Sequence, residues 1–274
     1  MDPRDRFTAT VQAYARHRPD YPEALYDWIL DVAGLGPGAV VVDLGCGTGI
    51  VARALARRGL RVFGVDPNAA MLAEAAARGG HDLGDGAQGG GPRWVQTDAE
   101  TLALPIERAD AIVGGQSFHW LDLERAGPRM RALLGEDGPV VPFWNLRDPS
   151  DPFMAAYEAL LLAWSPEYAR VGAEPRARLL LDRWPGHRAG FAHHQDLDRA
   201  GLRGRAWSSS YVQHGVTDAA GFDRELDRLF ERHQRDGQVR FVYRTEAVAW
   251  RAGGVGGGGG DPTAPRPGSC APRG

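Results

Sequence analysis

The chain has 274 residues, of which 43% are hydrophobic, so it can bury a substantial core as one large domain or as one domain with an insertion. Its 32 basic and 35 acidic residues leave a formal charge of −3, so the chain as a whole has no strong positive electrostatic field that would attract nucleic acid. No run of about 18 apolar residues is present and residues 1–6 lack the apolar core of a secretory signal, so we expect a cytoplasmic protein without a membrane span.

The first part of the chain predicts helices, a strand and then a glycine-rich loop. Residues 7–35 have the apolar spacing of two short helices, and residues 39–44 form an apolar strand. The strand runs into Asp43–Gly49, where Gly45, Gly47 and Gly49 allow positive φ angles and close approach of a ligand to the main chain. A helix predicted from Ile50 places this loop at a helix N-terminus, where backbone N–H groups can hold a carboxylate.

The order of the acid and the glycines distinguishes this loop from the G-x-G-x-x-G motif that binds nicotinamide dinucleotides. Counting from Gly45, the sixth position is Ile50 instead of glycine, and the acid precedes the glycines. Cys46, inside the loop, is interpreted as a small space-filling residue and not as a nucleophile. Neither of the two cysteines has a partner at metal-ligand spacing, so no metal is expected.

The next strand, residues 60–65, ends at Asp66. A carboxylate at this strand end is placed to accept both hydroxyls of a ribose. The alternative is a helix N-cap, since Pro67 follows and residues 69–77 are rich in strong helix formers. Residues 79–92 carry so many glycines that they predict a loop insertion.

Further strands are predicted at 94–97, 109–115 and 139–144, and the alternation of strands and helices favours a mostly parallel sheet with right-handed crossovers. Beyond residue 148 the pattern changes. Amphipathic helices are predicted around 153–164 and 222–230, and residues 189–196 and 239–250 are candidates for a closing pair of strands. The Gly- and Pro-dominated tail, residues 253–274, predicts disorder.

These pieces, in this order, resemble the class I S-adenosylmethionine-dependent methyltransferases. The D-x-G-x-G-x-G loop is similar to their motif I, and Gln116–Trp120 is similar to a Q-(small)-F-H-W segment of the methyltransferase type 11 and trans-aconitate methyltransferase-like subgroup. The resemblance implies a doubly wound, Rossmann-like α/β fold with a seven-stranded sheet, mostly parallel with an antiparallel closing strand, and a helical lid or insertion after strand five. Residues 165–215 are harder to register against the family.

The resemblance also implies that S-adenosyl-L-methionine is the cofactor and indicates which residues hold it. The implied cofactor contacts are Asp43, Gly45, Gly47, Gly49, Asp66, Asp98, Ala99 and Gln116. Within this set, the Asp98 carboxylate can accept from the adenine amino group and the Ala99 N–H can donate to a ring nitrogen. The alternative for Asp98 is an exposed loop acid.

His119 and Trp120 are implied to border the acceptor pocket. His119 could take a proton from the acceptor as a general base, or it could only hydrogen-bond a loop and shape the pocket. Trp120 could pack, or it could face the sulfonium as a cation–π partner.

The segment Tyr14–Pro22 resembles a Y-x-x-x-R-P-x-Y-P sequence that the same subgroup carries ahead of motif I. Tyr14, Arg18 and Tyr21 are therefore expected to form a lid at the acceptor. Arg18 offers a fork of donors suited to a carboxylate, but it could equally be a surface residue that pairs with Asp20 or Glu23.

The sequence thus predicts four parts: a helical lid at 1–36, a cofactor-binding core at 37–148, helices with closing strands for the acceptor at 149–252, and the tail at 253–274. The implied function is methyl transfer to a small molecule by in-line displacement, to a carboxylate or hydroxyl ahead of carbon or nitrogen. An RNA or protein methyltransferase and an inactive cofactor-binding regulator are the alternatives. The absence of an N/D-P-P-Y/F segment after strand four counts against adenine-N6 or glutamine methylation.

Overall fold

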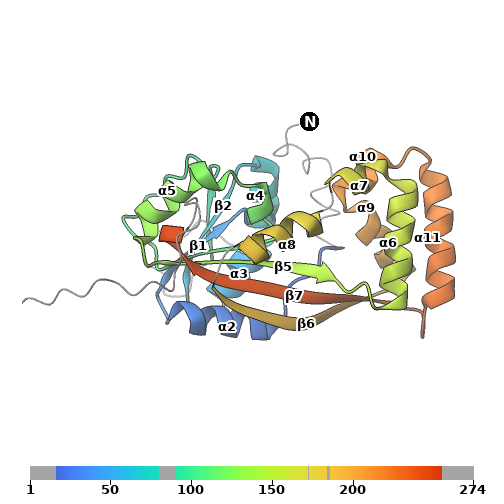
Figure 1. Ribbon diagram of the computed structural model, residues 1–274, viewed down its shortest axis with the longest axis horizontal. Helices are drawn as coiled ribbons and strands as arrows, with labels where there is room; N and C mark the ends of the chain where they lie inside the picture. Colours follow the sequence, from blue (N-terminus) through green and yellow to red (C-terminus); the bar gives the residue numbers. More distant parts are fainter. Residues whose placement is uncertain (1–16, 80–90, 172, 184–185, 255–274) are drawn as a thin grey trace, which may run out of the picture.

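The computed structural model describes residues 17–79, 91–171, 173–183 and 186–254 (Figure 1). Its centre is a seven-stranded sheet in the order β3-β2-β1-β4-β5-β7-β6. Strands β1 to β5 are parallel, and β7 is antiparallel to both β5 and β6. The strands are β1 (Val40–Leu44), β2 (Arg61–Asp66), β3 (Arg93–Gln96), β4 (Ala111–Gly115), β5 (Pro139–Arg147), β6 (His187–Leu197) and β7 (Val239–Arg251).

Helices cover both faces of the sheet. On one face, α2 (Glu23–Ala33) and α3 (Ile50–Ala56) bury their apolar sides against the central strands. On the other face, α5 (Leu123–Leu134) and α8 (Ala173–Arg183) contribute to a second apolar cluster. Helix α4 (Ala69–Ala77) contacts β2 and β3. The strand order reverses between β1 and β4, and in such sheets the carboxyl ends of the strands beside this point form the ligand crevice.

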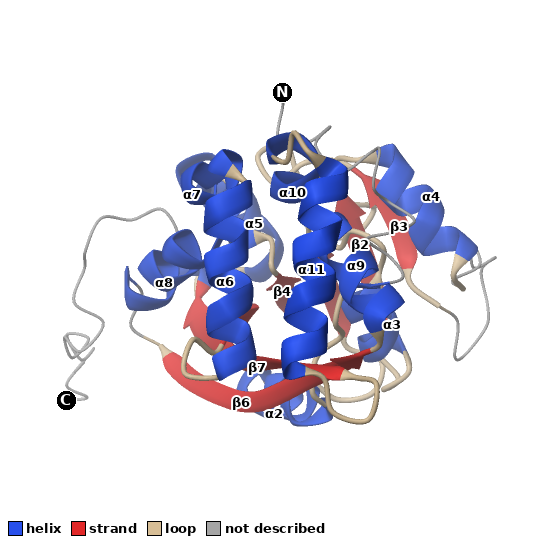
Figure 2. Cartoon of the chain, turned by 90° about the vertical axis from the view of Figure 1, so that its right-hand side faces the viewer, coloured by secondary structure: helices blue, strands red, loops and turns tan. Residues whose placement is uncertain are grey.

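A third apolar cluster lies at the far end of the long strands. Strands β5, β6 and β7 run past the parallel half of the sheet, and a group of helices gathers beyond it (Figure 1). Helices α6 (Pro152–Trp164) and α11 (Ala219–His233) pack side by side (Figure 2). The cluster also takes in residues of α7 (Pro166–Val171), α9 (Arg199–Trp207), α10 (Ser210–Gly215), β6 and β7.

The fold class is confirmed, including the antiparallel closing strand and the helices after strand five. The three strands predicted at 94–97, 109–115 and 139–144 match β3, β4 and β5, and the candidate closing pair matches β6 and β7. The proposed loop insertion at 79–92 and the first predicted helix lie mostly outside the described residues. Gly253 and Gly254, which the sequence assigned to the tail, belong instead to a 3-10 turn that begins at Ala252. No helix in the described part of the chain has both the length and the apolar character that a membrane crossing requires.

The Trp94 side chain of β3 packs against glycines of β2 and of the loop before α3. A Cβ atom on Gly64 would lie 2.4 Å from the Trp94 ring, and one on Gly49 would also lie 2.4 Å from it. The indole therefore occupies the space that two missing side chains leave, one on β2 and one at the start of α3.

We therefore expect Gly64→Ala to lower the free energy of unfolding by about 1–3 kcal/mol, because a rigid ring and two strands must shift to admit one methyl group. Urea denaturation measures the change. Gly36→Ala is the control, since a Cβ atom there meets nothing within 4 Å and its φ is not positive. Equal stability of the two variants would contradict this account of the packing.

Candidate functional site

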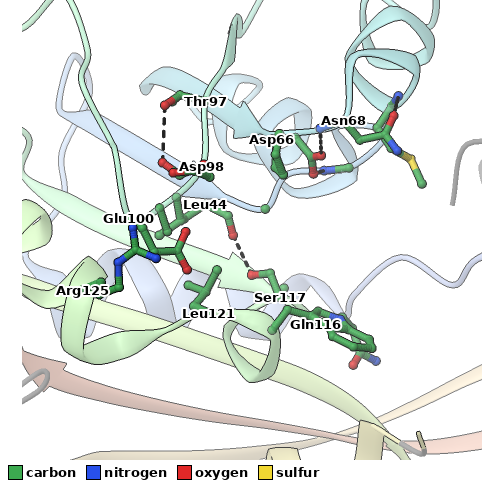
Figure 3. A pocket seen from close by; sticks show the side chains of 17 residues that line it. Leu44, Asp66, Asn68, Thr97, Asp98, Glu100, Gln116, Ser117, Leu121 and Arg125 are labelled. Carbon is green, nitrogen blue, oxygen red and sulfur yellow. Dashed lines mark hydrogen bonds between the residues drawn. The ribbon is translucent and has the colours of Figure 1, made fainter. Parts of the chain in front are cut away.

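A cavity of about 540 Å³ opens at the carboxyl ends of β1, β2, β3 and β4. Asp66 and Asn68 lie on one side of it, and Ser117 and Gln116 lie on another (Figure 3). Its walls combine glycine backbone, apolar side chains and a few carboxylates. This composition suits a ligand with an apolar body and several polar groups.

The loop between β1 and α3 is held from both neighbouring strands. The N–H groups of Gly45 and Cys46 donate to the Val65 carbonyl oxygen at 2.8 and 2.9 Å. The Ser117 hydroxyl donates to the Leu44 carbonyl oxygen at 2.6 Å, and a Cβ atom on Gly45 would lie 2.5 Å from the Ser117 Cβ. Glycine is therefore required at position 45 for two reasons. A Cβ atom would collide with Ser117, and the φ angle is positive, at 74°.

Asp43 is a fully buried carboxylate at the base of this loop. The Ala52 N–H approaches it closely enough to oppose part of the pKa rise, but within the described residues neither carboxylate oxygen has a hydrogen bond of acceptable geometry. Burial raises the pKa of Asp43 to about 7. An orphaned buried carboxylate is costly, so its position indicates a cationic or donor-bearing group of a ligand as the missing partner.

Asp66 ties the end of β2 to the glycine loop. Its Oδ2 accepts from the Gly47 N–H at 2.9 Å and its Oδ1 accepts from the Asn68 N–H at 2.9 Å. The alternative role as a helix N-cap is filled by Asn68, whose side chain accepts from the N–H groups of Ala70 and Met71. Asp66 therefore faces the 540 Å³ cavity as a positioned acceptor, and burial raises its pKa.

Asp98 and Ala99 line the same cavity just past β3. The Asp98 Oδ1 accepts from the Thr101 N–H at 2.8 Å and from the Thr101 hydroxyl at 2.5 Å. Glu100, also on the wall, accepts from the Asp122 N–H at 3.0 Å. These bonds hold an acidic loop in a fixed place over the cavity.

Gln116 stands at the end of β4 in a strained conformation. Its φ is 59°, in the left-handed region of backbone conformation that residues other than Gly, Asn and Asp rarely adopt. Its N–H donates to the Phe143 carbonyl oxygen at 2.9 Å, and its Nε2 donates to the Asn145 carbonyl oxygen at 3.1 Å. Two bonds to β5 therefore hold the chain in a turn that brings Gln116 into the cavity.

A second cavity, of about 50 Å³, lies on the other side of the glycine loop. It shares Gly45, Gly47, Gly115 and Gln116 with the larger cavity. Its remaining wall combines two short segments with three single residues from later in the chain: Arg18, Pro19 and Tyr21; Asp43, Cys46, Thr48, Ile50 and Val51; and Asn145, Arg205 and Tyr243. The two cavities therefore meet at the glycine loop and at the end of β4.

The residues 18–21 form part of this second wall. Tyr21 packs edge-on against Phe143 with ring centroids 4.7 Å apart. Asp20 lies near His193, and Glu23 pairs with Arg58. Helix α2, which belongs to the predicted lid of residues 1–36, packs on the sheet instead, and Tyr14 lies outside the described residues.

His119 lines neither cavity. Its Nδ1 accepts a hydrogen bond from the Trp144 indole N–H at 3.1 Å, so the proton of the neutral ring lies on Nε2. Burial lowers the pKa of His119 to about 3, and the positive charges of Arg176 and Arg18 contribute. A ring whose only lone pair is engaged is a poor base, so the geometry favours the second reading, in which His119 shapes the loop.

Trp120 lines the larger cavity, with the Arg176 guanidinium 5.7 Å from its ring centroid. Gly49, by contrast, lines neither cavity. It is the N-cap residue of α3, and its φ of 78° lets the chain turn into that helix. The structure thus gathers Asp43, Gly45, Gly47, Asp66, Asp98, Ala99, Gln116, Arg18, Tyr21 and Trp120 around two adjoining cavities, and it leaves out Gly49 and His119.

The sequence analysis missed Ser117, Asn145 and Arg205 as residues of the site. Ser117 and Asn145 are buried polar residues at strand ends, a pattern visible in the sequence. Arg205 carries no local pattern, because only the tertiary fold brings α9 to the cavity.

Comparisons with known proteins agree with this architecture. Residues 42–141 match the family model described as a methyltransferase domain. An uncharacterized methyltransferase of Mycobacterium tuberculosis is 35% identical over 144 residues, which cover 52% of this chain and 53% of that protein. A probable S-adenosylmethionine-dependent methyltransferase of Saccharomyces cerevisiae is 28% identical over 180 residues, which cover 64% of this chain and 59% of that protein.

Among solved structures, a putative type II methyltransferase from Anaeromyxobacter dehalogenans superposes with a TM-score of 0.64 at 23% identity, covering 86% of this chain and 98% of that one. The chain spans about half the length of the curated relatives it matches first. Residues 42–141 are thus similar to a methyltransferase domain, which agrees with the resemblance inferred from the motifs, and the superposed structure shows the same fold.

The raised pKa of Asp43 predicts a dependence of stability on pH. The folded state holds the Asp43 proton up to about pH 7 while the unfolded chain releases it near pH 4, so stability falls as pH rises through this window. Relative to Asp43→Asn, the wild-type protein should lose up to roughly 4 kcal/mol between pH 4 and pH 7 and change little above it. Urea unfolding of both proteins from pH 4 to pH 8 measures the difference. Parallel stability curves would show that Asp43 is not an uncompensated buried acid.

Proposed function

We propose that this protein transfers the methyl group of S-adenosylmethionine to a small-molecule acceptor, with an oxygen of a carboxylate or hydroxyl favoured over carbon or nitrogen. The observation that carries the proposal is the shared wall of the two cavities at Gly45, Gly47, Gly115 and Gln116. A cofactor with its nucleoside part in the larger cavity would bring its methionine part to this wall, where Asp43 lines the smaller cavity.

The residues present fit the cofactor. The larger cavity offers Asp66 at the position for ribose hydroxyls and Asp98 with Ala99 at the position for the adenine. The buried Asp43 carboxylate lacks a partner, which suits the ammonium group of the methionine part. Gly45 and Gly47 leave the backbone open to close approach, since nothing lies within 4 Å of a Cβ atom on Gly47.

The sulfonium of the cofactor supplies an already electrophilic methyl group. The protein's own task is to align the acceptor and to exclude water. The glycine loop and the strained turn at Gln116 fix one side, and Arg18, Tyr21 and Asn145 close the other. No base is required for a carboxylate acceptor, which already carries its nucleophilic lone pair.

The near-neutral charge of the chain supports a small acceptor over RNA or protein. Labelled S-adenosylmethionine incubated with a metabolite extract, followed by mass spectrometry, tests the proposal. We expect label in a small molecule. Label only in added RNA or protein, or cofactor binding without any transfer, would overturn it.

Asp66→Ala should weaken binding of S-adenosylmethionine about 10- to 100-fold, because it removes the proposed ribose acceptor and releases the Gly47 N–H that shapes the loop. Isothermal titration calorimetry measures the change in Kd. Asp27→Ala on α2 is the matched control, since that carboxylate is exposed and remote from both cavities. An unchanged Kd in Asp66→Ala would place the cofactor elsewhere.

His119→Asn should keep kcat within about tenfold, because Asn retains an acceptor for the Trp144 N–H and a general base would contribute 10²- to 10⁴-fold. The dependence of kcat/KM on pH between 6 and 9 should not change, since the His119 pKa of about 3 lies below this range. A 100-fold loss together with the loss of an ionisation near neutrality would instead establish His119 as the base.

A further inference from the structure

Strand β6 ends the sheet and leaves one of its own two edges open. It lies outermost, beyond β7, and its 11 residues pair with β7 in one antiparallel register from His187 opposite Ala249 to Leu197 opposite Val239 (Figure 1). Within the described residues, no backbone hydrogen bond joins β6 to any element other than β7. The N–H and C=O groups of its outer edge are therefore open to a further strand.

The sequence of β6 has few of the features that normally keep an edge strand from pairing. Protected edge strands are usually short, contain proline or lysine, or carry a bulge. β6 is 11 residues long, contains neither proline nor lysine, and pairs with β7 without a bulge. Gly190 and Ala192 give the middle of the strand little side-chain bulk of its own. An approaching strand therefore meets few obstacles along this edge.

The two faces of β6 differ in their surroundings. On one face, Phe191 packs against Trp28 of α2, with ring centroids 6.3 Å apart. The residues at even positions from 188 to 196 belong to the other face and are exposed. A strand added at the outer edge would bond through its main chain and leave both sets of side chains on their present faces.

The pattern of side chains favours a second copy of the same strand. Ala192 is the central residue of β6, so a two-fold axis through it pairs all 11 residues of the strand with those of the copy. In this register Arg188 lies opposite Asp196, and symmetry forms the pair twice. These two are the only ionisable residues of the strand apart from its histidines, and no histidine lies opposite another. The strand is therefore complementary in charge to itself.

Both charged side chains are accessible to a partner. The Arg188 side chain is 47% exposed, bonds to the Leu181 carbonyl oxygen and lies 3.5 Å from an Asp182 oxygen. The Asp196 side chain is 33% exposed and accepts two hydrogen bonds from Arg240, at 2.7 and 2.9 Å. Because a carboxylate offers about four acceptor sites, Asp196 can also accept from a second guanidinium.

We propose that β6 pairs antiparallel with β6 of a second copy of this chain, which joins two seven-stranded sheets across a two-fold axis at Ala192. The inference is independent of the proposed function, because no residue of β6 lines either cavity. A contact between two edge strands lies at the low end of the sizes that support a specific interface. The dimer should therefore dissociate in the micromolar range.

Analytical ultracentrifugation of the full chain, from micromolar to several hundred micromolar, measures the oligomeric state. We expect a reversible equilibrium of monomer and dimer. A chain that stays monomeric over the whole range overturns the proposal.

Two charge reversals test the register. Arg188→Glu sets acids opposite Asp196, and Asp196→Lys sets cations opposite Arg188, so each variant alone should dimerise at least tenfold more weakly than the wild type. A mixture of the two should recover the dimer, because each acidic strand then faces a basic one. Unchanged dimerisation of both single variants, or no recovery in the mixture, overturns the proposal.

Arg203→Glu is the matched control, because it makes the same charge reversal at an exposed arginine of α9 that also pairs with an acid, Asp223. It should dimerise like the wild type. Ala192→Lys, at an exposed position, provides a test that leaves the Asp196–Arg240 pair intact, and two lysines at the axis should weaken the dimer at least tenfold.

Hydrogen exchange locates the interface directly. Amides within residues 187–197 should exchange more slowly in concentrated wild-type protein than in dilute protein, and this difference should be absent in Ala192→Lys. Protection that appears only in other segments would show that a different surface forms the dimer and would overturn the proposal.

Discussion

The loop after β1 is held by polar groups from both neighbouring strand ends, and the site depends on this arrangement. From β2 come the Val65 carbonyl oxygen and the Asp66 carboxylate, and from the end of β4 comes the Ser117 hydroxyl. A parallel sheet brings these ends to one edge, and the absence of side chains at Gly45 and Gly47 lets them approach the loop closely. The same contacts that shape the loop therefore form the boundary between the two cavities.

Unfavourable electrostatics gather in the wall of the smaller cavity. Within the described residues, Asp43 is buried without a hydrogen bond of acceptable geometry, and no carboxylate pairs with the buried Arg205. Gln116, which lines both cavities, adds a strained backbone. Groups of this kind cost stability in the free protein and are retained where a ligand completes them. The rest of the chain, with three apolar clusters, supplies the stability that offsets this cost.

The sheet and much of the wall of the larger cavity could be predicted because their determinants are local. Buried parallel strands appear as continuous apolar runs, Asp43 and Asp66 each follow such a run directly, and Asp98 lies two residues past β3. The wall of the smaller cavity could not be predicted in this way. Asn145 bonds to the Asp20 carbonyl oxygen and to the Thr245 hydroxyl, across separations of 125 and 100 residues. The role of His119 likewise depends on Trp144, a neighbour that sequence spacing does not reveal.

The placement of β7 between β5 and β6 has a consequence for how the chain acquires its shape. Strands β1 to β4 are complete by Gly115, and they bring together the walls of the larger cavity. The smaller cavity needs Tyr243, which arrives with the final strand. Because long-range pairings form late, and because synthesis proceeds from the N-terminus, we expect the nascent chain to assemble the larger cavity well before the smaller one is complete. An emerging chain would then hold half a site until its last strand inserts between two others.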